Sequence, residues 1–490
     1  MSSTTRARPE LPPGLVAVRR MPRGIADDVE VAIELARRFN AEVTGPRHLE
    51  VDARVSADPS SVPWDVVRAA SEWGLYTAWL PRAFGGRGLS MLSLYYFLEE
   101  VSTVCVGIAN VVGVHYLGVS TLSATWNARL MRRVFEDVVA GERRGEPCLV
   151  SLAITEPAAG TDMEETELLE RIRPGTVAER AAGGYRVNGR KVFISNGHVS
   201  RWHVVVCVED RARAPETGVV LAVRTGTPGF TLGALENKMG QKACVASELV
   251  FDDCFVSDEQ VAIDARQSAS IGIPVRAVFQ QVIDYVVSST RAGVGAFGAG
   301  VARGAFVAAC EHARKGSPEG TRLVDDQSVR MRLADMYANA QVARLAWQES
   351  AWANCEQGLF RGLFSPVVFG IERALPGVLL RRLAPRFLDH PSTTRWLRHA
   401  GFARYPRSAA NLTSGWGSLA KLVGSDLALA NADLALELMG SDGTRHAAGA
   451  EKRLRDAKLL QIYEGTNQLN RLNVFKCLVG HEWSDVDPFG

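Results

Sequence analysis

The spacing of apolar residues changes twice along this 490-residue chain, and these changes restrict the folds that it can adopt. From about residue 27 to 146, apolar residues recur at helical spacing. Over residues 148–264 the pattern changes to short β-branched runs such as Trp202–Val208. From about residue 275 onward the spacing is helical again. The sequence therefore predicts an α+β chain in which a strand-rich middle part separates two helical parts.

These changes give the expected domain boundaries. We expect a disordered basic tail over 1–24, an N-terminal helical domain over 25–147, a middle β domain over 148–265 and a C-terminal helical bundle over 266–490. The tail lacks an apolar stretch, so no secretory signal is expected. Residues 101–128 carry no formal charge, but Ser, Thr, Asn, His and Trp interrupt them, which favours buried helices over a transmembrane span.

Composition narrows the class of protein. With 47% hydrophobic residues, 22% charged residues and a net charge of +2, the chain is typical of a globular protein and shows no attraction for nucleic acid. The eight cysteines lack CxxC spacing and the nine histidines lack an HExxH pattern. The sequence therefore predicts reduced thiols, no metal site and a cytoplasmic protein.

Local patterns predict individual elements. The Asn188-Gly189 pair within 185–193 predicts a β-hairpin turn, and Gly218–Val223 and Ser247–Phe251 are expected strands. Residues 291–314 predict a helix whose small residues allow close packing, and Glu451–Leu460 a further helix.

The run Gln-Ile-Tyr-Glu-Gly-Thr-Asn-Gln-Leu at 461–469 follows that last helix. It places the carboxylate of Glu464 directly before Gly465. In isolation such a turn could merely cap a helix. Preceded by Arg-Asp-Ala-Lys at 455–458, however, the run resembles the active-site segment of the acyl-CoA dehydrogenase family. The resemblance implies that Glu464 is the base that removes the proton next to a thioester carbonyl. The Gly465 N–H would hydrogen-bond the carbonyl oxygen.

Two middle segments resemble the flavin-binding segments of the same family. Residues 154–162 (Ile-Thr-Glu-Pro-Ala-Ala-Gly-Thr-Asp) imply that Thr155 binds the pyrimidine edge of FAD and that Thr161 binds its pyrophosphate. Residues 191–197 (Lys-Val-Phe-Ile-Ser-Asn-Gly) imply that Phe193 shields one flavin face and that Ser195 bonds flavin N5. In isolation both segments fit ordinary strand-to-turn loops. The resemblance adds three further residues, Thr466 and Gln468 at the cofactor and Arg291 near the acyl-CoA entrance.

The resemblance extends over about residues 74–471 and implies a family fold. That fold has an N-terminal helical domain, a middle β-barrel-like domain and a C-terminal four-helix bundle, which here contains a long insertion. Further markers are the Met-Gly loop at 238–242, a helix motif at 333–336 and the helix over 420–440.

The chain departs from the family where cross-subunit FAD contacts are expected. The Arg-x-x-Phe-Gly motif falls on Gly316–Gly320, including Glu319, so both the Arg and the Phe are missing. The family Gln falls on Glu437, whose carboxylate would repel a pyrophosphate. One interpretation is a heteromer with a second dehydrogenase-like subunit that binds one FAD. The other is a homo-oligomer that binds FAD more weakly or in a shifted pose.

A second departure is an insertion over about residues 359–415. Between 359 and 407 it carries nine arginines against Glu372 and Asp389, among apolar clusters and prolines. This composition suits peripheral contact with an anionic membrane, docking of a partner or a lid over the acyl pocket. It equally suits an excursion that packs on its own protein.

The predicted function is flavin-dependent α,β-desaturation of an acyl thioester, carried by CoA or by acyl carrier protein. Glu464 would take the proton, flavin N5 the hydride, and an electron-transfer flavoprotein the electrons. The alternatives are an acyl-CoA oxidase and a non-catalytic or FAD-sharing subunit of a heteromeric enzyme. A flavin monooxygenase or nitroalkane oxidase is disfavoured, because the base position holds Glu.

Overall fold

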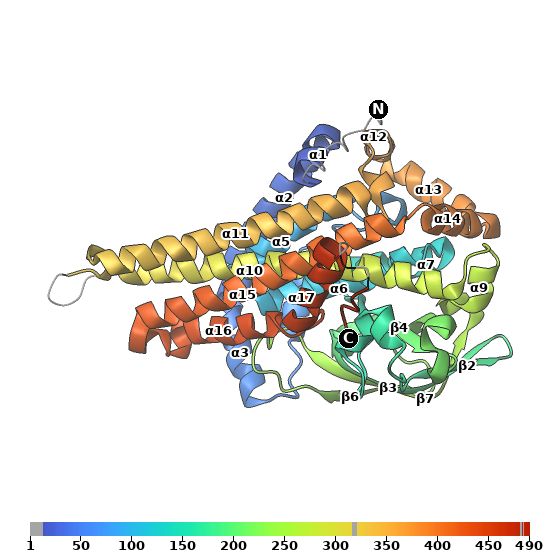
Figure 1. The fold of residues 1–490 in the computed structure, drawn as a ribbon, viewed down its shortest axis with the longest axis horizontal. Coiled ribbons are helices and arrows are strands. Elements are labelled where there is room, and N and C mark those ends of the chain that lie inside the picture. Colours follow the sequence, from blue (N-terminus) through green and yellow to red (C-terminus); the bar gives the residue numbers. More distant parts are fainter. Residues whose placement is uncertain (1–12, 316–320, 481–482, 484) are drawn as a thin grey trace.

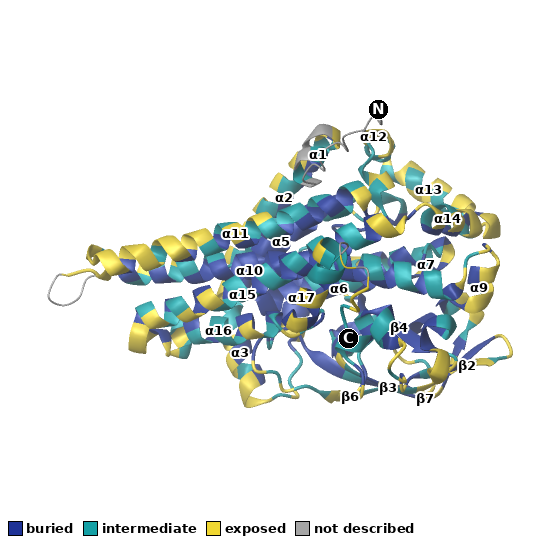
Figure 2. Ribbon diagram, viewed as in Figure 1, coloured by how far each residue is buried: buried dark blue, intermediate teal, exposed yellow. Residues whose placement is uncertain are grey.

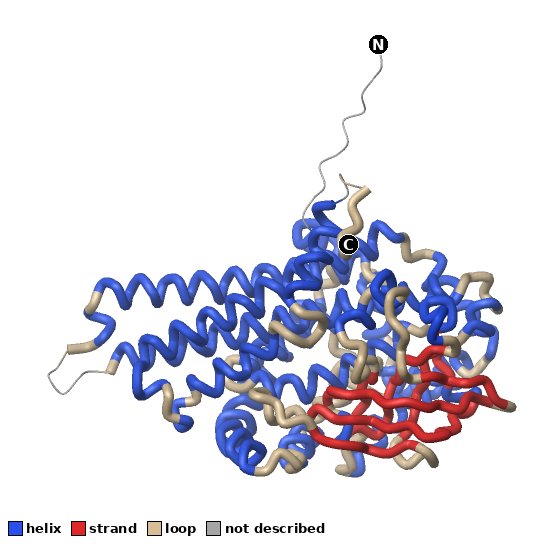
Figure 3. The backbone as a smooth tube through the Cα atoms, turned by 60° about the horizontal axis from the view of Figure 1, so that its bottom comes forward, coloured by secondary structure: helices blue, strands red, loops and turns tan. Residues whose placement is uncertain are grey.

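The computed structural model describes residues 13–315, 321–480, 483 and 485–490, and these form helical, sheet and helical parts in chain order (Figure 1). In Figure 3 the strands gather at one side of the molecule and the long helices extend away from them. The N-terminal helices are α1 (Pro13–Arg20), α2 (Gly24–Phe39), α3 (Gly45–Ala57), α4 (Trp64–Glu72), α5 (Met91–Ser102), α6 (Val106–Ala124) and α7 (Ala128–Arg144).

The expected disordered tail is wrong from Pro13 onward. Residues 13–20 form α1, which lies against α11 (Gln327–Gln357). The Gly14 N–H, at the open first turn of α1, donates to Glu349 Oε1 at 2.9 Å. Tail composition does not predict this contact, because the partner lies 335 residues further along the chain. Residues 1–12 lie outside the described part of the chain.

The middle part is one eight-stranded sheet in the order β6-β7-β3-β2-β4-β5-β8, with β1 paired to β4. Apolar residues from alternate strand positions form a separate core cluster here. The strands are β1 (Leu149–Ala153), β2 (Val177–Ala181), β3 (Gly184–Ser195), β4 (Ser200–Val208), β5 (Gly218–Arg224), β6 (Phe230–Leu235), β7 (Ala246–Ser257) and β8 (Val261–Ile263).

The predicted hairpin turn at Asn188-Gly189 is wrong. β3 runs straight through these two residues, and the chain reverses at residues 182–183, where Gly183 has φ +76°. Gly189 has φ +140° and lies at a register shift against β7. A Cβ there would lie 2.6 Å from Thr176 Cα. The glycine therefore serves a bulge with close backbone approach, which the same dipeptide signals as readily as a turn.

The C-terminal part is a bundle of long helices side by side (Figure 1). A Cβ on Gly298 of α10 would lie 2.3 Å from the Gly424 oxygen of α15, so the small residues permit close helix contact as expected. The remaining helices are α8 (Thr166–Leu169), α9 (Ala265–Ala269), α10 (Val275–Arg314), α15 (Arg407–Gly443), α16 (Ala450–Leu460) and α17 (Asn467–Val474).

Two helices, α6 and α10, are long and apolar enough to cross a membrane by length and composition alone. In their most apolar windows, however, 78% and 72% of the residues are buried inside the protein. Figure 2 shows both helices largely enclosed by neighbouring elements. They are core helices in this structure, which agrees with the sequence interpretation of residues 101–128.

The insertion forms three short helices, α12 (Pro366–Ala374), α13 (Gly377–Leu388) and α14 (Pro391–Ala403). Its predicted end was too late, because residues 407–415 already belong to α15. Ion pairs Arg373–Asp28 and Arg132–Asp389 hold the insertion against the N-terminal part. On its inner side, the insertion therefore packs against the rest of the same chain, which was one of the interpretations of its sequence.

Candidate active site

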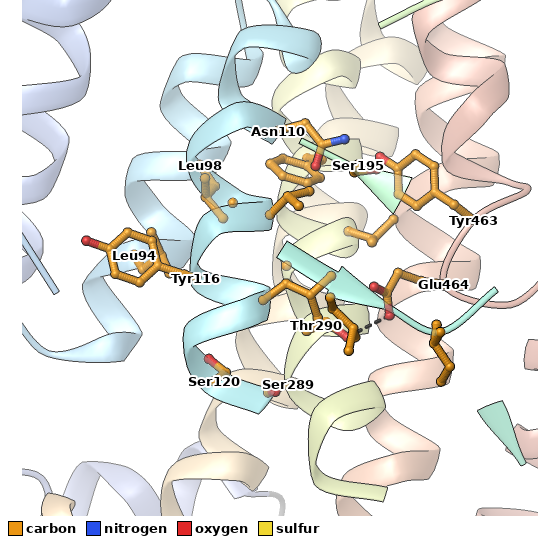
Figure 4. Close-up of a pocket in the computed structure, with 18 of the residues that line it drawn as sticks. Leu94, Leu98, Asn110, Tyr116, Ser120, Ser195, Ser289, Thr290, Tyr463 and Glu464 are labelled. Carbon is orange, nitrogen blue, oxygen red and sulfur yellow. Dashed lines mark hydrogen bonds between the residues drawn. The ribbon is translucent and has the colours of Figure 1, made fainter. Parts of the chain in front are cut away.

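A cavity of about 170 Å³ lies where the three parts of the chain meet. It receives side chains from α5, α6 and α10, from the ends of β1 and β3, and from the turn after α16 (Figure 4). Its lining includes the apolar side chains of Leu94, Leu98, Val114, Leu117 and Phe297. Glu464 and the segments around Thr155 and Ser195 also line it, so the structure brings together motifs separated by about 300 residues.

Glu464 lies in a tight turn between α16 and α17. It has φ +56° and Gly465 has φ +74°, so two successive residues occupy the left-handed region. A Cβ on Gly465 would lie 2.9 Å from Leu469 Cδ2 and 3.0 Å from Glu164 Oε2. Glycine is therefore required here for both conformation and space.

Buried polar side chains hold this turn from behind. Lys421 Nζ donates to the Gly465 oxygen at 2.7 Å, and Arg291 Nε donates to the Glu464 oxygen at 3.1 Å. Asn470 Nδ2 also donates to the Gly465 oxygen, at 2.9 Å. Burial, and then the nearby Arg291 charge, lower the pKa of Lys421 to about 7.

The Glu464 carboxylate points into the cavity from the turn. Its Oε2 accepts a hydrogen bond from Thr290 Oγ1 of α10 at 2.6 Å (Figure 4). Burial raises the pKa of Glu464, while Thr290, Arg291 and Lys421 oppose the rise. A carboxylate with a raised pKa is a stronger proton acceptor than one in water.

Gly465 is a buried residue, and within the described residues its N–H donates no hydrogen bond to another group of the chain. A buried N–H without a partner is rare in folded proteins. Gly465 directly follows Glu464 in the turn, although it does not itself line the cavity.

A second carboxylate lines the same cavity. Glu164 pairs with Arg291 Nη2 at 3.0 Å, and its side chain is 15% exposed. Burial raises the pKa of Glu164 to about 7; Arg291 opposes this and the Glu464 charge adds to it. Burial and the neighbouring Glu464 charge thus both favour the protonated form of Glu164.

The structure corrects the position expected for Arg291. It is fully buried behind the turn instead of at a substrate entrance, and it does not line the cavity. Its guanidinium bonds the Glu464 backbone, Ser418 Oγ and Glu164. Arg291 therefore positions the turn.

Three of the predicted flavin contacts line the cavity, namely Thr155, Phe193 and Ser195. The Val192 N–H donates to the Thr155 oxygen at 3.0 Å and joins the two segments. Phe193 has φ +57° and remains 59% exposed, which is unusual for a bulky residue. An exposed ring beside two hydroxyls fits the face and polar edge of a flavin, so these residues suit FAD.

The other predicted cofactor residues do not reach this cavity. Thr161 begins a short 3₁₀ turn, and Gln468 is exposed on α17. Thr466 Oγ1 accepts from the Leu469 N–H at 3.3 Å and caps α17. Glu437 is exposed and pairs with Arg332 at 3.2 Å, which offsets its charge. Residues 316–320 lie outside the described part of the chain.

Sequence reasoning gave no role to four residues that the structure places at the site. Thr290 and Glu164 flank Glu464, Lys421 holds the turn, and Gln241 Oε1 accepts from Tyr463 Oη at 3.3 Å. Each lies in or beside a quoted motif. Their position next to a motif was the only feature of the sequence that could have pointed to a role at the site. Their contacts could not be predicted, because the partner residues are distant in sequence.

Comparisons with known proteins agree with this architecture. Family models match the N-terminal domain of acyl-CoA dehydrogenases at residues 27–142, the middle domain at 151–254 and the C-terminal domain at 280–365 and 401–478. The unmatched interval within the C-terminal domain contains α12, α13 and most of α14.

Named relatives and solved structures extend the match over nearly the whole chain. A cyclohex-1-ene-1-carbonyl-CoA dehydrogenase of Geobacter metallireducens is 27% identical over 93% of this chain and 99% of its own length. A benzylmalonyl-CoA dehydrogenase of Aromatoleum aromaticum is 28% identical over 67% of this chain and 79% of its own.

The solved butyryl-CoA dehydrogenase of Megasphaera elsdenii has a TM-score of 0.69 at 23% identity, covering 92% of this chain and 98% of that one. The three domain matches, in family order and around a cavity with the motif carboxylate, show that the chain belongs to the acyl-CoA dehydrogenase family and is an FAD-dependent oxidoreductase that acts on acyl-CoA.

Proposed function

We propose that the chain introduces an α,β double bond into an acyl-CoA, with Glu464 as the base that removes the α-proton. The observation that carries this proposal is the position of the Glu464 carboxylate. It opens into the cavity that Thr155, Phe193 and Ser195 also line, together with apolar side chains. Burial raises its pKa, which suits proton abstraction from a weak carbon acid.

The turn supplies a second element of the proposed reaction. As the α-proton leaves, negative charge develops on the thioester oxygen, and the Gly465 N–H is the donor assigned to it. Lys421 and Arg291 keep the turn in place through its carbonyl oxygens. Bound FAD would accept the hydride from the β-carbon. Thr155, Phe193 and Ser195 are the residues that would hold its ring system.

We assign CoA in preference to acyl carrier protein because the relatives named above are dehydrogenases of CoA thioesters. Their acyl groups, cyclohexenecarbonyl and benzylmalonyl, are cyclic or aromatic. We therefore place cyclic and aryl-substituted acyl-CoAs first among candidate substrates, beside straight-chain ones. The proposed electron acceptor is an electron-transfer flavoprotein, with oxygen as the alternative.

The decisive test is the visible spectrum of the flavin-loaded protein during anaerobic addition of acyl-CoAs. We expect the flavin band to bleach with at least one substrate. Glu464→Gln should keep the band while slowing bleaching by about 10²–10⁴-fold, the usual contribution of a general base. Glu179→Gln, at an exposed position of β2 outside the site, is a matched control that should bleach at the normal rate. Equal bleaching rates in Glu464→Gln and the unaltered chain would exclude Glu464 as the base.

The second candidate is an FAD-sharing or non-catalytic subunit, which the missing cross-subunit residues at 316–320 favour. FAD content and native mass together separate the candidates. One FAD per chain in a homo-oligomer would exclude the sharing subunit. A colourless chain that gains FAD only with a second dehydrogenase-like chain would support it.

A further inference from the structure

The insertion helices expose an unusual amount of apolar side chain. Among the described residues, 25 large apolar side chains are exposed, and nine of these lie between residues 363 and 396. Val367 and Ile371 of α12 are 67% and 56% exposed, and Trp396 of α14 is 61% exposed. Figure 2 shows the outer sides of α12, α13 and α14 as exposed along one edge of the molecule. Concentrations of this kind mark interaction surfaces.

Helix α13 arranges its exposed residues in two adjacent lines. Leu379, Leu383 and Phe387 follow one another at four-residue spacing, and so lie on one line along the helix. Arg382 and Arg386 form the neighbouring line and are also exposed. An apolar line beside a basic one is the pattern of a helix that lies at a membrane surface.

The charge of this surface is not neutralised by the chain itself. Within the described residues, four exposed arginines of α13 and α14 have no ion-pair partner: Arg381, Arg382, Arg386 and Arg395. The two acidic residues of the insertion are paired, Asp389 with Arg132 at 2.7 Å and Glu372 with Arg373 at 3.6 Å. The surface is therefore both apolar and basic.

The insertion cannot bury this surface by turning inward, because its inner side is already fixed. Arg373 pairs with Asp28, and Arg132 holds Asp389 through two hydrogen bonds. Arg398 of α14 is buried and donates to the backbone oxygens of Thr125 and Ala262. These contacts set which side of the insertion faces outward.

We propose that α12, α13 and α14 form a membrane-contact surface that binds a bilayer containing anionic lipid. Phosphate headgroups would pair with the free arginines, while Leu379, Leu383 and Phe387 enter the headgroup boundary. A second copy of the chain fits less well. A contact that used the same surface on both copies would place one arginine array against another.

The test is flotation of the flavin-loaded protein with vesicles of phosphatidylcholine alone or mixed with phosphatidylglycerol. We expect flotation only with the anionic vesicles, weakening as salt rises. Leu383→Ser with Phe387→Ser should weaken binding by more than tenfold. Each of Arg382→Gln and Arg386→Gln should weaken it by about fivefold, the effect of one basic residue near an anionic surface.

The matched control is Met331→Ser with Leu345→Ser on α11, whose side chains are 65% and 64% exposed outside the insertion. This variant should float like the unaltered chain, and all variants should retain their flavin spectrum and melting temperature. Absence of flotation, or equal flotation with neutral vesicles, would overturn the proposal. Light scattering that showed self-association lost only in the Leu383/Phe387 variant would assign the surface to contacts between copies instead.

Discussion

At the scale of single residues, the site depends on a carboxylate held in a conformation that most residues avoid. A non-glycine residue in the left-handed region costs about 1–2 kcal/mol. Glu464 keeps this conformation because Arg291 and Lys421 bond the carbonyl oxygens of the turn. Burial raises the pKa of Glu464, and Thr290 limits that rise. The neighbours of Glu464 therefore set both its position and its basicity.

Thr290→Val should shift the acidic limb of the pH profile of kcat/KM to higher pH. The Thr290 hydroxyl stabilises ionised Glu464, so its loss raises the pKa of this proposed base further. A hydrogen bond to a charged acceptor contributes about 1.5–3 kcal/mol, so we expect roughly a tenfold loss at pH 6 and a smaller loss at pH 8. Thr290→Ser should restore the profile. Ser289→Ala is the control and should leave the profile unchanged, because the Ser289 hydroxyl donates only to backbone oxygens of its own helix. An unmoved limb in the Val variant would contradict the assignment.

Glu164→Gln should reduce the loss of stability as pH rises. The folded-state pKa of Glu164 is about 7, above its ordinary value of 4.5. The folded protein therefore holds the extra proton, and stability falls between those two pH values. The shift corresponds to roughly 3 kcal/mol. The melting temperatures of the holoprotein at pH 5 and pH 8 measure it. Glu167→Gln is the control, because Lys476 lowers the pKa of Glu167 against the effect of burial. An unchanged difference between the two pH values in the Glu164 variant would contradict the prediction.

At the scale of elements, one buried ion pair joins the two segments that approach the proposed flavin. Lys191 Nζ of β3 contacts Glu156 Oε1 at 2.7 Å, with the two side chains 0% and 2% exposed. Lys191 also donates to the Ile154 oxygen at 2.9 Å, and Glu156 accepts from the Thr176 N–H at 3.1 Å. Thr155 directly precedes Glu156, and Phe193 lies two residues after Lys191, so the ion pair helps to fix the distance between these two residues.

Lys191→Met should destabilise the protein by about 3–5 kcal/mol, because it leaves the Glu156 carboxylate buried without its partner. We expect a lower melting temperature together with faster loss of FAD on dilution. Arg190→Met is the matched control one residue away. Arg190 pairs with Glu248 on the surface, and such a pair contributes about 0–1 kcal/mol. Equal effects of the two substitutions would show that the buried pair does not support the flavin segments.

At the scale of the whole molecule, the insertion is part of the contact between domains. Arg398 of α14 is 6% exposed and donates to Thr125, which follows α6, and to Ala262 of β8. One side chain of the C-terminal part thus satisfies backbone oxygens in both other parts. The cavity also receives side chains from all three parts, although Arg398 and its two partners do not line it.

Arg398→Met should reduce the free energy of unfolding by roughly 2–4 kcal/mol, because buried backbone oxygens lose a charged donor. The three parts should still unfold in one transition, at a lower melting temperature. Differential scanning calorimetry measures this change. Arg395→Met, at an exposed site on the same helix, should change stability by less than about 0.5 kcal/mol. A separate early transition in the Arg398 variant would show instead that the domains unfold independently.

The sequence alone determined the order of helical and sheet parts, because apolar periodicity records which face each element buries. It also predicted that Glu464, Thr155, Phe193 and Ser195 belong to one site, because each lies in a local motif, and the structure places all four around one cavity. Local chemistry was less decisive where one pattern permits two structures. Asn188-Gly189 suits both a turn and a bulge, and only pairing with β7 selected the bulge.

Tertiary structure alone decided which groups surround the carboxylate. Thr290, Glu164 and Lys421 lie near Glu464 or its turn, although all three are far from it in sequence. No local sequence pattern encodes contacts between such distant residues. Arg291 was expected near the substrate entrance, but the structure places it, fully buried, behind the turn. The direction and burial of a side chain depend on the packing of distant elements, and so does the pKa of Glu464.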